Sequence, residues 1–112
     1  MSKDLSISVL MDFYGGLLTE KQRDSLELYY DQDCSLAEIA EDMDISRQGV
    51  RDFIKRGEKQ LYEFEEKLGL VKKYTNISSN ISRLEEMIDE IKLDETSQDT
   101  IKNIIESIKK EI

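Results

Sequence analysis

The sequence has 112 residues, with 25 acidic and 16 basic side chains, a formal net charge of −9, and neither proline nor histidine. This length suits one small domain, or a small domain with an appendage. An acidic chain with a pI near 4.5 is repelled by polyanions at long range, which excludes indiscriminate coating of nucleic acid but not a local basic face. No apolar run reaches the roughly 20 residues that a membrane span needs, so we expect no membrane insertion. Residues 1–5 lack the features of a secretory signal, and we expect a cytoplasmic protein.

Most residue types that carry catalytic or metal chemistry are missing. With no histidine and a single cysteine, Cys34, the chain has neither an internal disulfide nor a soft-metal site. Its glycines lack the spacing of a phosphate-binding loop. Neighbouring carboxylates such as Glu65 and Glu66 point apart on a helix and are interpreted as solvated faces. We therefore predict no enzyme, no cofactor and no metal, and Cys34 as a small packed hydrophobe.

Composition favours helix along the whole chain, because leucine, isoleucine, glutamate and lysine are abundant and no stretch alternates polar and apolar residues for long. We predict an all-α fold. Apolar spacing predicts a first helix over residues 5–14, ended by a glycine pair. A second helix begins after Thr19, whose side chain can form a capping box with Gln22, and breaks at residues 31–33.

The next segment has the spacing of a helix-turn-helix. A capping box at Ser35 opens a short helix over residues 36–43. Asp44 suits a tight turn, because aspartate tolerates the left-handed conformation better than most residues do. Ser46 caps the next helix, which is predicted to continue to Leu68.

The pattern changes after Gly69, a natural helix C-cap. Seven apolar residues over 70–91 follow a heptad repeat, which indicates a long helix facing another helix. A break at residues 94–97 leads to a last amphipathic helix over residues 98–112. The pattern therefore predicts a helical hairpin over residues 70–112.

These patterns predict two domains, a helix-turn-helix domain over residues 1–69 and a C-terminal helical hairpin over residues 70–112. The returning helix is too short to cover the whole heptad seam. Its uncovered end packs either on the chain's own N-terminal helices or on another molecule, such as a second copy in a homodimer through residues 70–112. Both alternatives stay open here.

A row of basic residues follows one side of the helix that begins after Ser46. Four of them are spaced at i, i+4, where like charges oppose each other by ~0.2 to 0.5 kcal/mol per pair, so an anion is expected beside them. Residues 46–60 hold five basic and two acidic side chains, a net of +3 in a chain of −9. The functional hypothesis is nucleic-acid binding, with four residues at base edges or in a groove and three at phosphates. The first group is Ser46, Arg47, Gln48 and Arg51, and the second is Lys55, Arg56 and Lys59.

The alternative for this row is pairing inside the molecule. Carboxylates of the preceding helix and of the same helix could supply the counter-charges, and those on the preceding helix would also repel an approaching phosphate backbone. The candidates are Glu38, Glu41, Asp42, Asp52 and Glu58.

Three motifs occur in order along the chain: DFYGGLLTEKQR at residues 12–23, SLAEIA at residues 35–40, and SRQGV at residues 46–50 with IKR at residues 54–56. In these motifs the chain resembles the YlxM family of small bacterial helix-turn-helix proteins, whose module is similar to region four of sigma factors. The resemblance covers residues 5 to about 70. It implies a sigma-region-four-like domain, a link to the signal recognition particle pathway, and binding of DNA or of the particle's RNA. It brings no catalytic or metal residues.

Two functions are therefore predicted as alternatives. The first is a nucleic-acid-binding accessory or regulatory protein that takes part in the signal recognition particle pathway. The second is a protein-interaction module that docks on the particle's GTPase or its receptor, with the helix-turn-helix as scaffold only.

Overall fold

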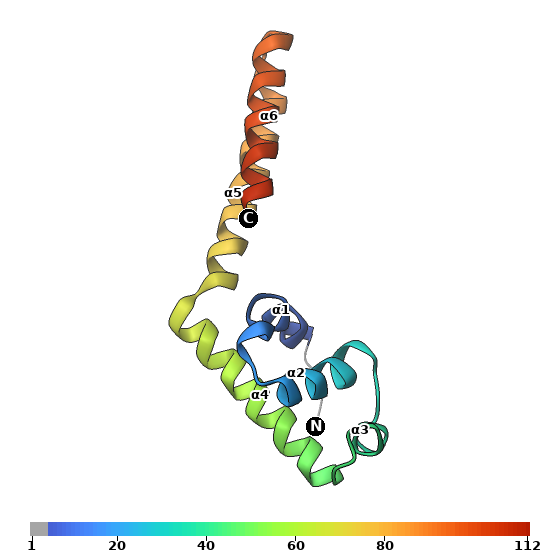
Figure 1. The fold of residues 1–112 in the computed structure, drawn as a ribbon. Helices are drawn as coiled ribbons and strands as arrows, with labels where there is room; N and C mark the ends of the chain where they lie inside the picture. Colours follow the sequence, from blue (N-terminus) through green and yellow to red (C-terminus); the bar gives the residue numbers. More distant parts are fainter. Residues whose placement is uncertain (1–4) are drawn as a thin grey trace. The chain divides into compact units, whose positions relative to one another are not determined.

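The structure, a computed structural model, describes residues 5–112, and these residues form six α-helices and no strand (Figure 1). The predicted all-α class is confirmed. Contacts divide the chain after Val71 into two compact units. A 3-10 turn (Gly15–Leu17) follows the first helix, and a π-helical turn (Glu27–Asp31) follows the second. The helices are α1 (Leu5–Tyr14), α2 (Glu20–Leu26), α3 (Leu36–Met43), α4 (Arg47–Leu68), α5 (Leu70–Glu90) and α6 (Glu95–Glu111).

Both predicted capping boxes are confirmed. Thr19 Oγ1 accepts from the Gln22 amide at 3.3 Å, while the Gln22 side chain accepts from the Thr19 amide at 3.2 Å. Ser35 Oγ accepts from the Glu38 amide at 3.1 Å, and the Glu38 carboxylate accepts from the Ser35 amide, also at 3.1 Å. Each box satisfies two amides that have no partner within the helix, which sets the starts of α2 and α3.

The predicted start of the last helix is wrong by three residues. We expected residues 94–97 to be a break, but α6 begins at Glu95. The reason is that Asp94 is itself an N-cap, with its carboxylate accepting from the Ser97 amide at 3.2 Å. Hydrogen bonds from the Ser97 side chain and amide lower the pKa of Asp94.

The first unit is organised around α4, which contacts α1, α2 and α3 (Figure 1). Gly57 of α4 lies against α2, and a Cβ there would meet Leu26 Cδ1 at 2.6 Å, so only glycine allows this approach. Cys34 is half-buried and packs against the same core, as predicted. The buried core comprises Ile7, Leu10, Tyr14, Leu18, Leu26, Tyr29, Ile39, Ala40, Val50, Ile54 and Leu61.

The junction between α4 and α5 is held by side chains. Gly69 adopts the left-handed conformation (φ 61°), and its amide donates to the Glu65 carbonyl at 2.8 Å. Tyr14 Oη donates to Glu65 Oε1 at 2.6 Å and accepts from the Leu70 amide at 3.0 Å. Glu65 Oε1 also accepts from the Val71 amide at 3.0 Å. Gly69 has no side chain with which to cap α5, and these two side chains do so in its place.

This network corrects one prediction from the sequence. Glu65 is half-buried and hydrogen-bonded, so the interpretation of this carboxylate as a solvated face is wrong. Burial and the hydrogen bond to Glu65 raise the pKa of Tyr14.

The second unit is the predicted hairpin, with α5 and α6 running antiparallel (Figure 1). The helices meet through a small cluster of Ile81, Ile88 and Ile105, with Ile101 packed beside it. Of the seven heptad positions on α5 and just after it, only Ile81 and Ile88 are buried. The remaining five are exposed: Leu70, Tyr74, Ile77, Leu84 and Ile91.

Within residues 5–112, none of the helices combines the length and apolar character needed to cross a bilayer.

Candidate nucleic-acid interface

The helix-turn-helix is built from α3, the three residues 44–46, and α4. Asp44 takes the left-handed conformation (φ 54°), as predicted for the turn. The Ile45 amide donates to the Ala40 carbonyl at 3.0 Å, which closes the end of α3. Ser46 Oγ then accepts from the Gly49 amide at 3.0 Å and starts α4. The turn is therefore fixed by hydrogen bonds at both helix ends.

Core packing determines which side of α4 faces outward. Val50, Ile54 and Leu61 are fully buried, and Ile39 of α3 belongs to the same core. Because these residues recur at i, i+4 and i+11, they occupy one side of α4 and leave the opposite side to solvent.

The structure brings the predicted contact residues together at the N-terminal part of α4 and its cap. A step of four residues advances the helix by about 6 Å and turns it by about 40°, so the row from Arg47 to Lys59 is roughly 18 Å long and winds gradually around the helix. All seven predicted residues are exposed: Ser46, Arg47, Gln48, Arg51, Lys55, Arg56 and Lys59.

These basic side chains are not neutralised within the described part of the chain. No ion pair joins the arginines or lysines of this row to a carboxylate of residues 5–112. The internal pairing considered from the sequence is therefore not present among these residues. A row of like charges without counter-ions at i, i+4 spacing is destabilising and favours an anion beside it.

Three of the proposed counter-charges are engaged elsewhere. Asp52 Oδ1 accepts from Gln48 Nε2 at 3.0 Å. Glu58 Oε1 accepts from Tyr30 Oη at 2.6 Å. Glu38 belongs to the capping box of α3, where hydrogen bonds from Ser35 lower its pKa. Each of these carboxylates therefore has a donor outside the row.

The contact between Tyr30 and Glu58 was not found from the sequence. Tyr30 lies in the π-helical turn after α2, edge-on to Tyr29 with ring centroids 5.1 Å apart. Burial and the hydrogen bond to Glu58 raise the pKa of Tyr30 well above its ordinary value. Nothing local in the sequence pairs these residues, because 28 positions separate them and the π turn sets the direction of the tyrosine.

The two helices of the motif differ in charge near the turn. Glu41 and Asp42 are exposed on α3, whereas residues 46–60, which include the first part of α4, have a net charge of +3. An anion near the turn is therefore attracted to the start of α4 and repelled by the acidic residues of α3. Among the residues that the structure describes, no group of three or more histidine, cysteine, aspartate or glutamate side chains is arranged to hold a metal ion.

Comparison with known proteins identifies the family. Residues 1–109 match the model of the UPF0122 family, described as "Putative helix-turn-helix protein, YlxM / p13 like". The chain is 49% identical over 108 residues to a UPF0122 protein of Thermoanaerobacter sp. (strain X514), covering 96% of this chain and 92% of the relative. It is 47% identical over 107 residues to a UPF0122 protein of Clostridium kluyveri, covering 94% and 96% of the two chains. A UPF0122 protein of Bacillus cereus (strain AH187) is 43% identical over 110 residues, covering 98% and 97%. The chain therefore belongs to the UPF0122 family of YlxM/p13-like helix-turn-helix proteins.

Proposed function

We propose that this protein is a nucleic-acid-binding accessory or regulatory protein, and that the outer side of α4 makes the contact. The observation that carries the proposal is the exposed basic row, which has no ion pair within the described residues. Membership of a helix-turn-helix family supports it, because the second helix of that motif enters the major groove of DNA.

The proposed roles of the residues follow from their places on α4. Residues near the start of a recognition helix reach base edges, so Ser46, Arg47, Gln48 and Arg51 are assigned to the groove. Gln48 is held by Asp52 and would exchange this hydrogen bond for one to a base. The remaining residues, Lys55, Arg56 and Lys59, lie further along the helix and are assigned to phosphates.

The nucleic acid is proposed to be DNA or the RNA of the signal recognition particle, because the chain resembles the YlxM family along its helix-turn-helix. A role in that pathway rests on the resemblance alone. Docking on the particle's GTPase, with the helix-turn-helix as scaffold, is the competing outcome of the experiment below.

The proposal is tested by fluorescence anisotropy of the full chain with labelled duplex DNA and with the labelled particle RNA, at about 50 mM and about 200 mM salt. A phosphate contact contributes about 0.9 to the slope of log affinity against log salt on duplex DNA, so this fourfold rise in salt costs roughly 3.5-fold per contact. Three contacts account for roughly 40-fold. The Lys55→Ala/Arg56→Ala/Lys59→Ala variant removes the three residues assigned to phosphates, so it should bind more weakly and lose this part of the salt dependence.

A charge-matched control separates a specific contact from a change in net charge. Lys73→Ala/Lys92→Ala/Lys110→Ala also removes three exposed positive charges, all from the second unit. This control should keep the wild-type slope. Equal effects of the two triple variants would refute the assignment to α4. Absence of binding to both nucleic acids at low salt would refute nucleic-acid binding and favour a protein partner.

A further inference from the structure

The hairpin of α5 and α6 is polar along one edge. Lys109 Nζ lies 2.9 Å from Glu85 Oε1, and Lys102 Nζ lies 3.9 Å from Asp89 Oδ1. The hydrogen bond to Glu85 raises the pKa of Lys109. These pairs bridge the two helices on one side of their contact.

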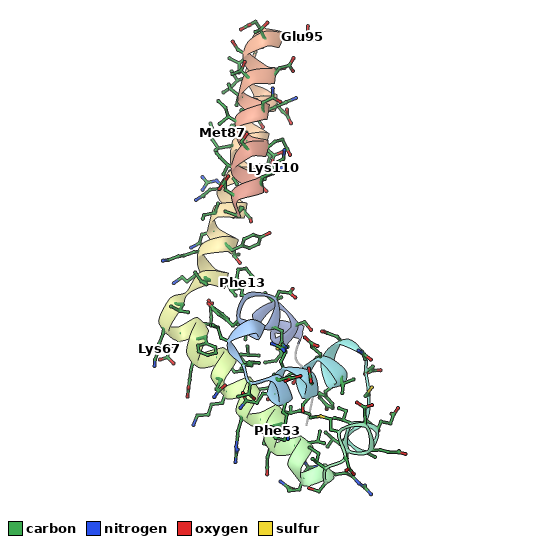
Figure 2. All side chains as sticks on the ribbon, in the orientation of Figure 1. Phe13, Phe53, Lys67, Met87, Glu95 and Lys110 are labelled. Atoms are coloured by element: carbon green, nitrogen blue, oxygen red, sulfur yellow. The ribbon has the colours of Figure 1, made fainter. Side chains whose placement is uncertain are left out.

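The opposite side of α5 is apolar. At about 100° per residue, Glu85 and Asp89 lie on one side of the buried Ile88, and Leu84 and Met87 lie on the other. Leu84 is 49% exposed and Met87 58% exposed. Figure 2 shows Met87 projecting outward from the hairpin.

The same division occurs on α6. Lys102 and Lys109 lie on one side of the buried Ile105, and the exposed Ile104 and Ile108 lie on the other. Since the helices are antiparallel and the lysines meet the acidic edge of α5, the isoleucines fall on the same face as the apolar side of α5. We call this surface the apolar face: Ile77, Leu84, Met87, Ile91, Ile104 and Ile108.

The apolar face is large enough for a stable interface. Its six side chains are 39% to 58% exposed, which corresponds to roughly 500 Å² of apolar surface, near the upper end for the largest patch on a monomer. Interfaces are about 60% apolar, so this surface implies roughly 800 Å² per partner, the standard size for a specific complex.

Charge indicates what kind of partner fits. Residues 72–112 contain seven basic and nine acidic side chains, a net of −2, whereas the whole chain has −9. Two hairpins therefore repel each other only weakly. The polar side chains that line the same hollow as Leu84 and Met87 are Asn80 and Arg83, and a single positive charge there does not make a nucleic-acid surface. Ile77, Leu84 and Ile91 of the apolar face recur every seven residues, and this spacing suits knobs-into-holes packing against a second copy of the chain.

The small core of the hairpin also favours a second copy as the partner. Within the second unit only Ile81, Ile88 and Ile105 are buried, and two helices that bury so little need a further layer. We propose that a second copy of this chain covers the apolar face, so that two hairpins form a four-helix bundle about a two-fold axis. This dimer does not depend on nucleic-acid binding by α4.

The test is sedimentation equilibrium of the full chain over a range of concentrations. The wild type should show twice the 13.1 kDa chain mass. Leu84→Glu and Ile104→Glu each place a charge in the apolar face and should raise the dimer dissociation constant by at least about tenfold. Ser79→Glu is the matched control, because it adds the same charge at an exposed position on the opposite side of α5, and it should leave association unchanged.

Thermal unfolding of the wild type keeps the proposal testable if either glutamate variant fails to fold. The melting temperature of a dimer rises with protein concentration, whereas that of a monomer does not. A monomer at every concentration would overturn the proposal, as would a dimer that Leu84→Glu and Ile104→Glu leave intact. Hydroxyl-radical labelling would show whether the apolar face of a monomer is protected from solvent. Protection in a monomer would mean that the chain's own N-terminal helices cover the apolar face, and it would also overturn the proposal.

Discussion

Replacing Gly57 by alanine tests how closely α2 and α4 approach. The new Cβ would lie 2.6 Å from Leu26 Cδ1 and 3.4 Å from its Cγ, and Leu26 is fully buried, so it has no free space into which to move. Overpacking of this kind costs about 1 to 3 kcal/mol. Alanine recovers up to about 1 kcal/mol of helix propensity relative to glycine. Since the contact is well inside van der Waals distance, we expect a net loss of about 1 to 2 kcal/mol of unfolding free energy.

The assay is urea and thermal unfolding followed by circular dichroism. For a domain of this size, each 1 kcal/mol shifts the melting temperature by about 4 to 8 °C. Gly16→Ala is the control, because a Cβ there meets no atom within 4 Å, and it should be neutral or slightly stabilising. A double-mutant cycle with Leu26→Ala should show that Gly57→Ala costs less once the leucine is shortened. A Gly57→Ala variant as stable as the wild type, or an equal cost in both backgrounds, would refute the reasoning.

Three further predictions concern single hydrogen bonds. Burial and the hydrogen bond to Glu58 raise the pKa of Tyr30, so the fold favours the protonated phenol. The free energy of unfolding should therefore fall as the pH rises above the ordinary tyrosine pKa of 10.0. Tyr30→Phe should flatten this dependence in urea titrations at several pH values. The carboxylate of Asp94 has a lowered pKa, so the stability that it adds to α6 as an N-cap should be lost as the pH falls below about 3.8. At neutral pH, circular dichroism should show reduced helicity for Asp94→Ala and nearly full helicity for Asp94→Asn. Ser46→Ala removes the acceptor for the Gly49 amide and should cost about 1 kcal/mol in chemical unfolding; no loss would mean that another group caps α4.

The features predicted well from sequence are those set by neighbouring residues. The bounds of α3 and α4 follow from Ser35, Asp44 and Ser46, whose side chains or backbone act within about three positions. The same logic predicts the exposed basic row, because the apolar residues of α4 leave only one side for it. Interactions between neighbouring residues were therefore sufficient to predict the helix-turn-helix from the sequence.

The features that were missed depend on residues far apart in the chain. Tyr14 and Glu65 are separated by 51 positions, and no local pattern indicates that their hydrogen bond caps α5. The heptad repeat predicted the long helix correctly, and the helix lengths predicted that α6 leaves part of the seam uncovered. Which heptad positions α6 buries could not be predicted, since this depends on how Ile81 and Ile88 pack against Ile105. The start of α6 was placed too late because Asp94 was assigned to the break and not to the cap.

The junction at Gly69 also determines which mutations this chain can accept. Between Glu65 and Val71 the number of residues is fixed by three hydrogen bonds, since a single insertion would turn the following backbone by about 100° and move both α5 amides away from their acceptors. The side chains at positions 66–68 are exposed and make no such demand. Positions 66–68 should therefore tolerate substitution, whereas Gly69 should not, and the junction should tolerate a change of length poorly, unlike most connecting loops.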